Sequence, residues 1–176
     1  MKLDKKDRFI IANQLKILEA LYPEEASSYA THRTAIEEGY VSHYEWAMES
    51  ISDEELTPET TREVIDTLDM FRALYFYRRE KDMSDINERS MKFKGYDGND
   101  SHECKMMAYA RYFVVELERF TEIIEEQGEY FDFNSHCMMR ENYQEMLQRW
   151  LKIEPGRQEG QRHNLTKDQV KSIIGE

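Results

Sequence analysis

Glycine, proline and cysteine are scarce in this chain of 176 residues, which has 7 glycines, 3 prolines and 2 cysteines. Sheet proteins need many tight turns, so a chain poor in glycine and proline is expected to be helical. The two cysteines, Cys104 and Cys137, lack the CxxC spacing of redox or zinc motifs. A lone pair of this kind excludes a disulfide scaffold and is typical of reduced thiols in a cytoplasm.

Long apolar segments are also missing. The longest apolar run near the start is Phe9–Ala12, far below the roughly 18–20 residues that a membrane span needs. The segment Met1–Asp7 lacks the apolar core and cleavage site of a signal peptide. Hydrophobic residues still make up 40% of the chain, which excludes disorder through lack of apolar surface. We therefore expect a cytoplasmic protein that does not bind a membrane.

Acidic residues exceed basic ones, and the net charge is −12. Two stretches, Glu45–Glu63 and Glu116–Asp132, each hold seven acidic residues against one arginine. The rest of the chain has 22 acidic and 22 basic residues, so these stretches carry the whole imbalance. Acidic surfaces repel phosphate backbones, which excludes direct nucleic-acid binding. The stretches are either a solvated surface or a surface for a basic protein partner, as in nucleic-acid mimicry.

Sequence motifs for catalysis, metals and cofactors are absent. The chain has no GxGxxG, GxxxxGK[ST], GxSxG or HExxH pattern. Asp97–Ser101 resembles the start of a calcium-binding EF-hand loop, but His102 and Ala108 stand where that loop needs glycine and glutamate. We therefore predict no metal, no cofactor and no catalytic residue.

Apolar residues recur at helical spacing in most of the chain, which predicts a series of helices with one buried face each. The expected helices are Asp4–Tyr22, Glu24–Glu38, Val41–Ser50, Pro58–Lys81, Asp100–Gln127, Met138–Lys152 and a short one from Thr166 through Ile174.

Several helix ends carry local signals. Gly39 is a left-handed cap, Thr57 and Pro58 begin a helix, and Thr166 with Gln169 forms a capping box, as do Asp100 and Glu103. We predict an all-α fold: a bundle-like domain over 1–154 with two long antiparallel helices, Pro58–Lys81 and Asp100–Gln127. Residues 155–176 form a linker and a short helix that docks on the same domain or on a second subunit.

Arg111 is the most distinctive charged residue, because it lies between Tyr109 and the pair Tyr112 and Phe113. A guanidinium among aromatic rings is expected to be partly desolvated and stacked on a ring. It either pairs with an internal carboxylate, for instance that of Asp97, or holds an acidic ligand.

Blocks of sequence along nearly the whole chain resemble the YfbU family of bacterial proteins. They include Arg8–Lys16, Ile36–Tyr40, Val64–Asp66, Phe93–Asp97, Tyr109–Phe113, Phe133–Asn134 and Tyr143–Leu147 with Trp150. The resemblance implies a helical cytoplasmic protein and supplies no biochemical activity or catalytic residue. It adds weight to Asn13, Gln14, Asp97, Arg111 and Asn134 as positions with a role.

Two functions remain open from the sequence. The favoured one is a non-enzymatic interaction or regulatory module that self-associates, as a homodimer, through an apolar helix face. The alternative is a small-ligand binder or enzyme with a pocket near Asp97, Arg111, Asn134 and Tyr143. The candidate ligand- or partner-binding residues are Asn13, Gln14, Asp97, Arg111, Asn134 and Tyr143.

Overall fold

A computed structural model describes residues 2–52, 54–81, 83, 85–128, 130–153 and 164–176. These ranges contain helices and one isolated bridge but no strand, which confirms the all-α prediction. The chain divides into two compact units, Met1–Glu55 and Leu56–Glu176, where one domain over 1–154 was expected. We describe each unit by itself.

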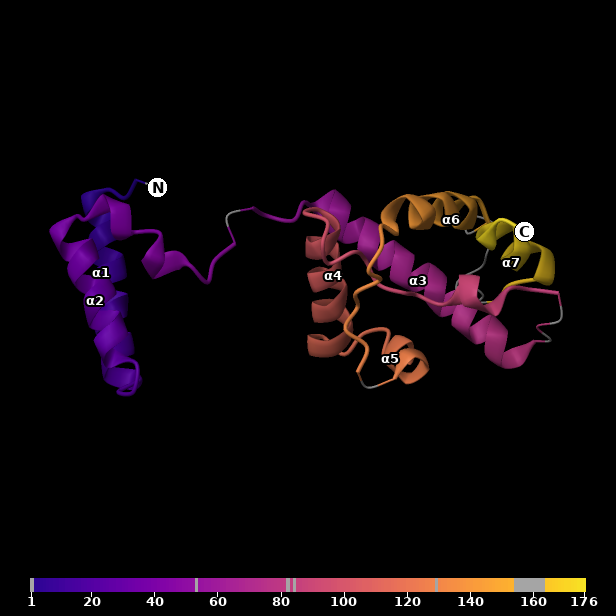
Figure 1. Ribbon diagram of the computed structural model, residues 1–176, viewed down its shortest axis with the longest axis horizontal. Coiled ribbons are helices and arrows are strands. Elements are labelled where there is room, and N and C mark those ends of the chain that lie inside the picture. The colour runs from indigo at the N-terminus through magenta and orange to yellow at the C-terminus, as the bar shows by residue number, and fades with distance from the viewer. Residues whose placement is uncertain (1, 53, 82, 84, 129, 154–163) are drawn as a thin grey trace. The chain divides into compact units, whose positions relative to one another are not determined.

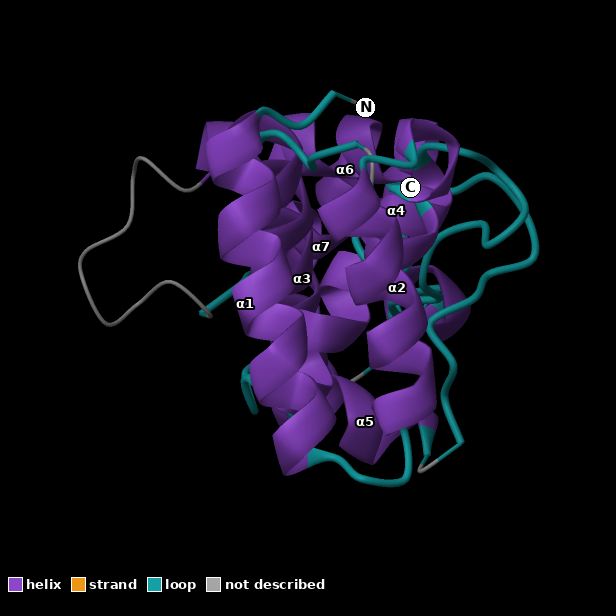
Figure 2. Cartoon of the chain, turned by 90° about the vertical axis from the view of Figure 1, so that its left-hand side faces the viewer, coloured by secondary structure: helices purple, strands orange, loops and turns teal. Residues whose placement is uncertain are grey.

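The N-terminal unit is a helical hairpin. Helices α1 (Lys5–Leu21) and α2 (Ala26–Glu38) lie side by side (Figure 2). Asp4 caps α1 by accepting hydrogen bonds from the Lys6 and Asp7 amides at 2.7 and 2.8 Å. As predicted, α2 ends at Gly39, which adopts a left-handed conformation.

The core of this unit is small. Its buried residues are Ala12, Leu15, Ile36 and Tyr44, with Leu3, Ile11, Leu18 and Tyr29 packed against them. The helix expected over Val41–Ser50 is instead two short 3₁₀ turns, η1 (Val41–His43) and η2 (Trp46–Met48). Only Tyr44 of residues 41–50 is buried, so little packing holds a longer helix together there.

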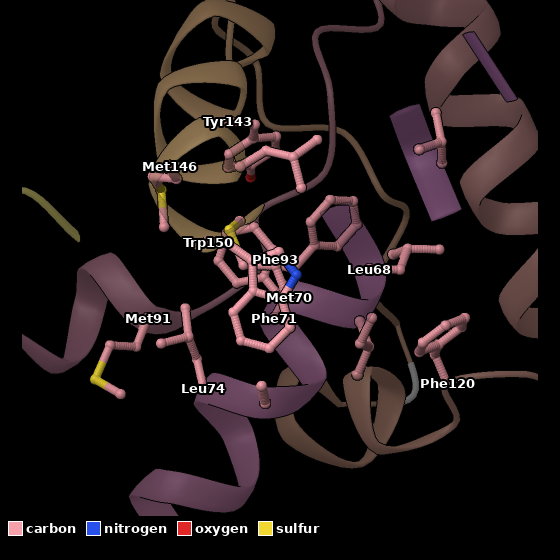
Figure 3. Close-up of a cluster of buried hydrophobic side chains, with 14 of the residues drawn as sticks. Leu68, Met70, Phe71, Leu74, Met91, Phe93, Phe120, Tyr143, Met146 and Trp150 are labelled. Carbon is pink, nitrogen blue, oxygen red and sulfur yellow. The ribbon is translucent and has the colours of Figure 1, made fainter. Parts of the chain in front are cut away.

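The C-terminal unit is organised around α3 (Pro58–Glu80), which contacts α4 (Glu103–Arg111), α5 (Glu122–Gln127) and α6 (Arg140–Ile153) (Figure 1). The Thr57 hydroxyl accepts a hydrogen bond from the Thr60 amide at 3.2 Å, so α3 begins where the sequence predicts. Its buried side packs on aromatic side chains of the following loop and of α6. Figure 3 shows this core, which includes Leu68, Phe71, Leu74, Phe93, Tyr143 and Trp150.

The predicted helix over Asp100–Gln127 is wrong as a single element. It consists of α4, a π-helical turn η4 (Tyr112–Glu116), a break and α5. Glu118 and Phe120 both have a φ of 52°, which no continuous helix allows. The pair of long antiparallel helices is therefore replaced by one long helix, α3, and several shorter ones.

Contacts with α3 explain this break. Phe120 lies under the Arg72 guanidinium, whose carbon is 3.8 Å from the ring centroid, and Arg72 also pairs with Glu122. These interactions fold α5 back against α3. They outweigh the preference of the local sequence for a continuous helix.

The short C-terminal helix, α7 (Lys167–Ile174), docks on the C-terminal unit. Thr166 and Gln169 form the predicted capping box, and Val170 and Ile173 are buried in the same core as α3 and α6. A helix of this length depends on such packing. The predicted linker over 155–163 lies outside the described residues.

Candidate functional site

Two loops of the C-terminal unit are joined where the family-like blocks Phe93–Asp97 and Phe133–Asn134 meet. The Tyr96 amide donates to the Phe133 carbonyl, and the Ser135 amide donates to the Tyr96 carbonyl, both at 3.0 Å. Gly95 has a φ of 89°, and a Cβ placed there would stand 1.9 Å from the Phe133 carbonyl oxygen. The junction therefore requires glycine at position 95.

Asn134 closes this junction with its side chain. Its carbonyl oxygen accepts from the Gly98 and His136 amides at 3.0 and 2.9 Å. The Asp97 carboxylate accepts from the amide and side chain of Asn99, at 2.9 and 3.1 Å. Both predicted site residues thus form turns within the junction, and these hydrogen bonds explain their presence without a ligand.

Glu103 has a structural role that the sequence, which indicated only a capping box, did not reveal. Its side chain is 1% exposed and its carboxylate accepts from the amides of Asp97, Met139 and Arg140, at 2.7–3.1 Å. The last two amides begin α6. Glu103 therefore connects the junction to α6, because its carboxylate, on α4, accepts from the amides at the start of α6. Asp100 accepts from the His102 and Glu103 amides and so caps only α4. The sequence signal for the burial of Glu103 was its position on the apolar stripe of this helix, before Met106 and Ala110.

A second charged group connects α3 to α6. The Arg140 guanidinium makes two hydrogen bonds of 2.9 Å to the Glu63 carboxylate, and Gln144 donates to the same group at 3.1 Å. Burial alone would raise the pKa of Glu63, but the bonds from Arg140 and Gln144 outweigh it and hold that pKa below its ordinary value. The pair orients α6 on α3.

Tyr143 lies in the core at the edge of a small cavity. Its hydroxyl accepts from the Lys94 amide at 2.9 Å, and burial raises the pKa of the phenol well above its usual value. The cavity, about 80 Å³, is the Tyr143 pocket; besides Tyr143 its lining is Arg89, Ser90, Lys92, Lys94, Met139, Asn142, Met146 and Ile174. Of the predicted site residues, Tyr143 is the one that lines it.

Among the residues that the structure describes, Arg111 does not pair with an internal carboxylate, which one of its two predicted roles required. Its side chain is 58% exposed, and the carboxylate near it is that of Glu116 at 3.9 Å rather than that of Asp97. It ends α4 at the surface, because the helix turns Ala110 inward and Arg111 outward. The prediction that Arg111 is desolvated is therefore wrong.

Asn13 and Gln14 belong to the N-terminal unit, where they flank the side of α1 opposite its buried residues Ala12 and Leu15. They share that side with Ile10, Ile17 and Leu21, which are 44%, 58% and 64% exposed. We call these five residues the α1 outer face. Asn13 also lines an open hollow of about 220 Å³ with Phe9 and Lys16.

Three carboxylates of the second acidic stretch contact side chains of α3. Besides the Arg72–Glu122 pair, Arg78 pairs with Glu126, and the Tyr75 hydroxyl donates to Glu125 at 3.2 Å. These three carboxylates hold α5 against α3.

Within the described residues, no group of three or more His, Cys, Asp or Glu side chains is placed to hold a metal ion. None of the described helices combines the length and apolar character needed to cross a bilayer.

Comparison with known proteins agrees with the sequence blocks. The family model described as YfbU domain matches residues 1–175. A curated relative from Methanocaldococcus jannaschii, named UPF0304 protein MJECS11, is 34% identical over 152 residues, which are 84% of this chain and 87% of the relative.

Proposed function

The chain belongs to the YfbU family, and from the exposed side of α1 we propose that it is a non-enzymatic interaction module that forms a homodimer. The α1 outer face is the surface through which two copies associate. The observation that carries the proposal is a row of large apolar side chains, Ile10, Ile17 and Leu21, on the side of α1 opposite its buried residues.

The N-terminal unit has more apolar surface than its own core can cover. Nine of the sixteen large exposed apolar side chains of the described residues lie in this unit, although it is less than a third of the chain. Contiguous apolar patches of this kind mark interaction sites in soluble proteins. A unit of about 55 residues also buries a small fraction of its surface, so covering the face would add to its stability.

Polar side chains in the middle of the face are consistent with a specific pairing. Asn13 and Gln14 lie between Ile10 and Ile17, and a polar residue in an otherwise apolar helix seam fixes register and oligomeric state. These two side chains would then hydrogen-bond across the interface.

Charge favours an antiparallel arrangement of two copies. Lys5 and Lys6 begin α1, and Glu24 and Glu25 lie three and four residues after its last residue, Leu21. An antiparallel pair places the basic end of each α1 beside the acidic end of the other, whereas a parallel pair would place like charges together. Ile10 of one copy then lies near Leu21 of the other.

Sedimentation velocity tests the proposal with one substitution on the face. Ile17→Glu puts a charge at its centre, and we expect it to raise the dimer dissociation constant by about a hundredfold or more. Ile51→Glu is the control, because Ile51 is 67% exposed in the same unit but lies outside α1. Wild-type protein that sediments as a monomer at every concentration contradicts the proposal, as does equal weakening by both substitutions.

Charge reversal tests the orientation. We expect Lys6→Glu and Glu24→Lys each to weaken association by about twofold to thirtyfold, since each removes two symmetric exposed ion pairs. The double variant should recover most of the loss. A double variant as weak as the sum of the two single ones contradicts the antiparallel arrangement.

A further inference from the structure

The Tyr143 pocket is a local exception to the charge of the chain. Its lining includes three basic side chains, Arg89, Lys92 and Lys94, and no carboxylate, in a protein of net charge −12. The Lys92 Nζ lies 3.2 Å from the Glu88 carboxylate, which also pairs with Arg78. Within the described residues, neither Arg89 nor Lys94 has an ion pair.

Neutral hydrogen-bonding groups complete the polar lining. Ser90 has a hydroxyl and Asn142 an amide. Tyr143 accepts from the Lys94 amide, and its raised pKa keeps the phenol protonated, so the phenol retains a proton to donate. Cations and neutral donors from two separate segments, 89–94 and α6, thus meet at one cavity, which is the composition of an anion site.

The size of the cavity limits the ligand. About 80 Å³ is several times the roughly 10–15 Å³ that one water molecule needs. It is well below the about 300–1,000 Å³ of pockets for larger organic ligands. A single tetrahedral oxyanion suits this volume, and a whole nucleotide does not.

We propose that the Tyr143 pocket binds a phosphate group, either the free ion or the phosphate of a monoester. Arg89 and Lys94 supply the charge, and Ser90, Asn142 and Tyr143 supply neutral donors. The site is independent of the proposed dimer, since all its residues lie in the C-terminal unit.

NMR titration of the full chain tests this site. Sodium phosphate is added at constant ionic strength against sodium chloride, and the amide signals of residues 89–94 and 142–146 are followed. We expect saturable shifts confined to these residues at millimolar phosphate. Absence of saturable shifts there overturns the proposal.

Substitutions identify the residues that bind. Arg89→Gln and Lys94→Gln should each raise the dissociation constant by about threefold to tenfold, as expected for loss of one charge-assisted hydrogen bond at a partly exposed site. Both side chains are exposed, so the fold should tolerate the changes. Lys152→Gln removes the same charge from α6 outside the pocket and should have little effect; an equal effect from Lys152→Gln overturns the proposal.

A parallel titration with methyl phosphate distinguishes the two sources of the group. Binding of both compounds assigns a monoester, and binding of inorganic phosphate alone assigns the free ion; either supports the site. The Arg89 and Lys94 variants should dimerise like wild type, so failure of this site and failure of the dimer are separate results.

Discussion

The buried carboxylate of Glu103 connects the loop at Asp97 to the start of α6, and its removal should destabilise the C-terminal unit. Its Oε1 accepts from Arg140 and Met139 at 2.7 and 3.0 Å, and its Oε2 accepts from Asp97 and Met139 at 2.8 and 3.1 Å. In Glu103→Gln one of these oxygens becomes an NH₂ group that faces amide donors. At least one buried amide then loses its acceptor.

The size of the effect follows from these bonds. An unpaired buried donor costs about 1–3 kcal/mol, and the remaining bonds lose the extra strength of a charged acceptor, about 1 kcal/mol each. Glu103→Gln should therefore lower the free energy of unfolding by about 2–4 kcal/mol. Glutamine and glutamate have similar helix propensities, so α4 itself is not the cause.

Urea unfolding measured by Trp150 fluorescence tests this value. Trp150 is fully buried in the C-terminal unit, and a Trp46→Phe background removes the other tryptophan, which lies in the N-terminal unit. Glu116→Gln is the control, because that side chain is 58% exposed. A loss in Glu103→Gln no larger than in Glu116→Gln, within about 0.5 kcal/mol, refutes the capping role.

Two further predictions use the same assay. Gly95→Ala should lower the free energy of unfolding by about 4 kcal/mol or more, because its Cβ would meet the Phe133 carbonyl. Gly128 has a φ of 94° but no atom within 4 Å of the place its Cβ would take, so Gly128→Ala should cost about 1–3 kcal/mol from backbone strain alone. Equal losses would contradict the account of the junction. Since the pKa of Glu63 is lowered in the folded state, its pair with Arg140 stabilises the protein above the ordinary value of 4.5 and is lost as the pH falls through the lower folded value. The stability gap between wild type and Glu63→Gln should shrink below about pH 4.5, and a gap that does not change with pH would contradict this.

Sequence reasoning succeeded where the signal is local. Thr57 with Pro58, Gly39, and Thr166 with Gln169 each define a helix end through neighbours within four residues, and the structure confirms all three. It failed at residues 117–121, which contain no glycine or proline. The break there depends on Arg72, some 50 residues earlier, and no local pattern reports such a contact.

The candidate site residues also differ in how far local sequence indicates their position. Asp97 and Asn134 meet because Gly95 allows two loops to approach, and Tyr143 joins them through Lys94. Arg111 was singled out by its aromatic neighbours in sequence, but the turn of α4 directs it to solvent. The basic residues around Tyr143 all lie in 89–94, and only the fold brings this segment against α6, so the pocket had no sequence signal.

The proposed dimer is tested most directly by isotope-filtered NMR on a mixture of labelled and unlabelled protein, which detects contacts between copies alone. An antiparallel pairing of the α1 outer faces predicts intermolecular contacts between the methyl groups of Ile10 and Leu21. Contacts of Ile10 with Ile10 of the other copy, or no intermolecular contact from α1, would contradict it.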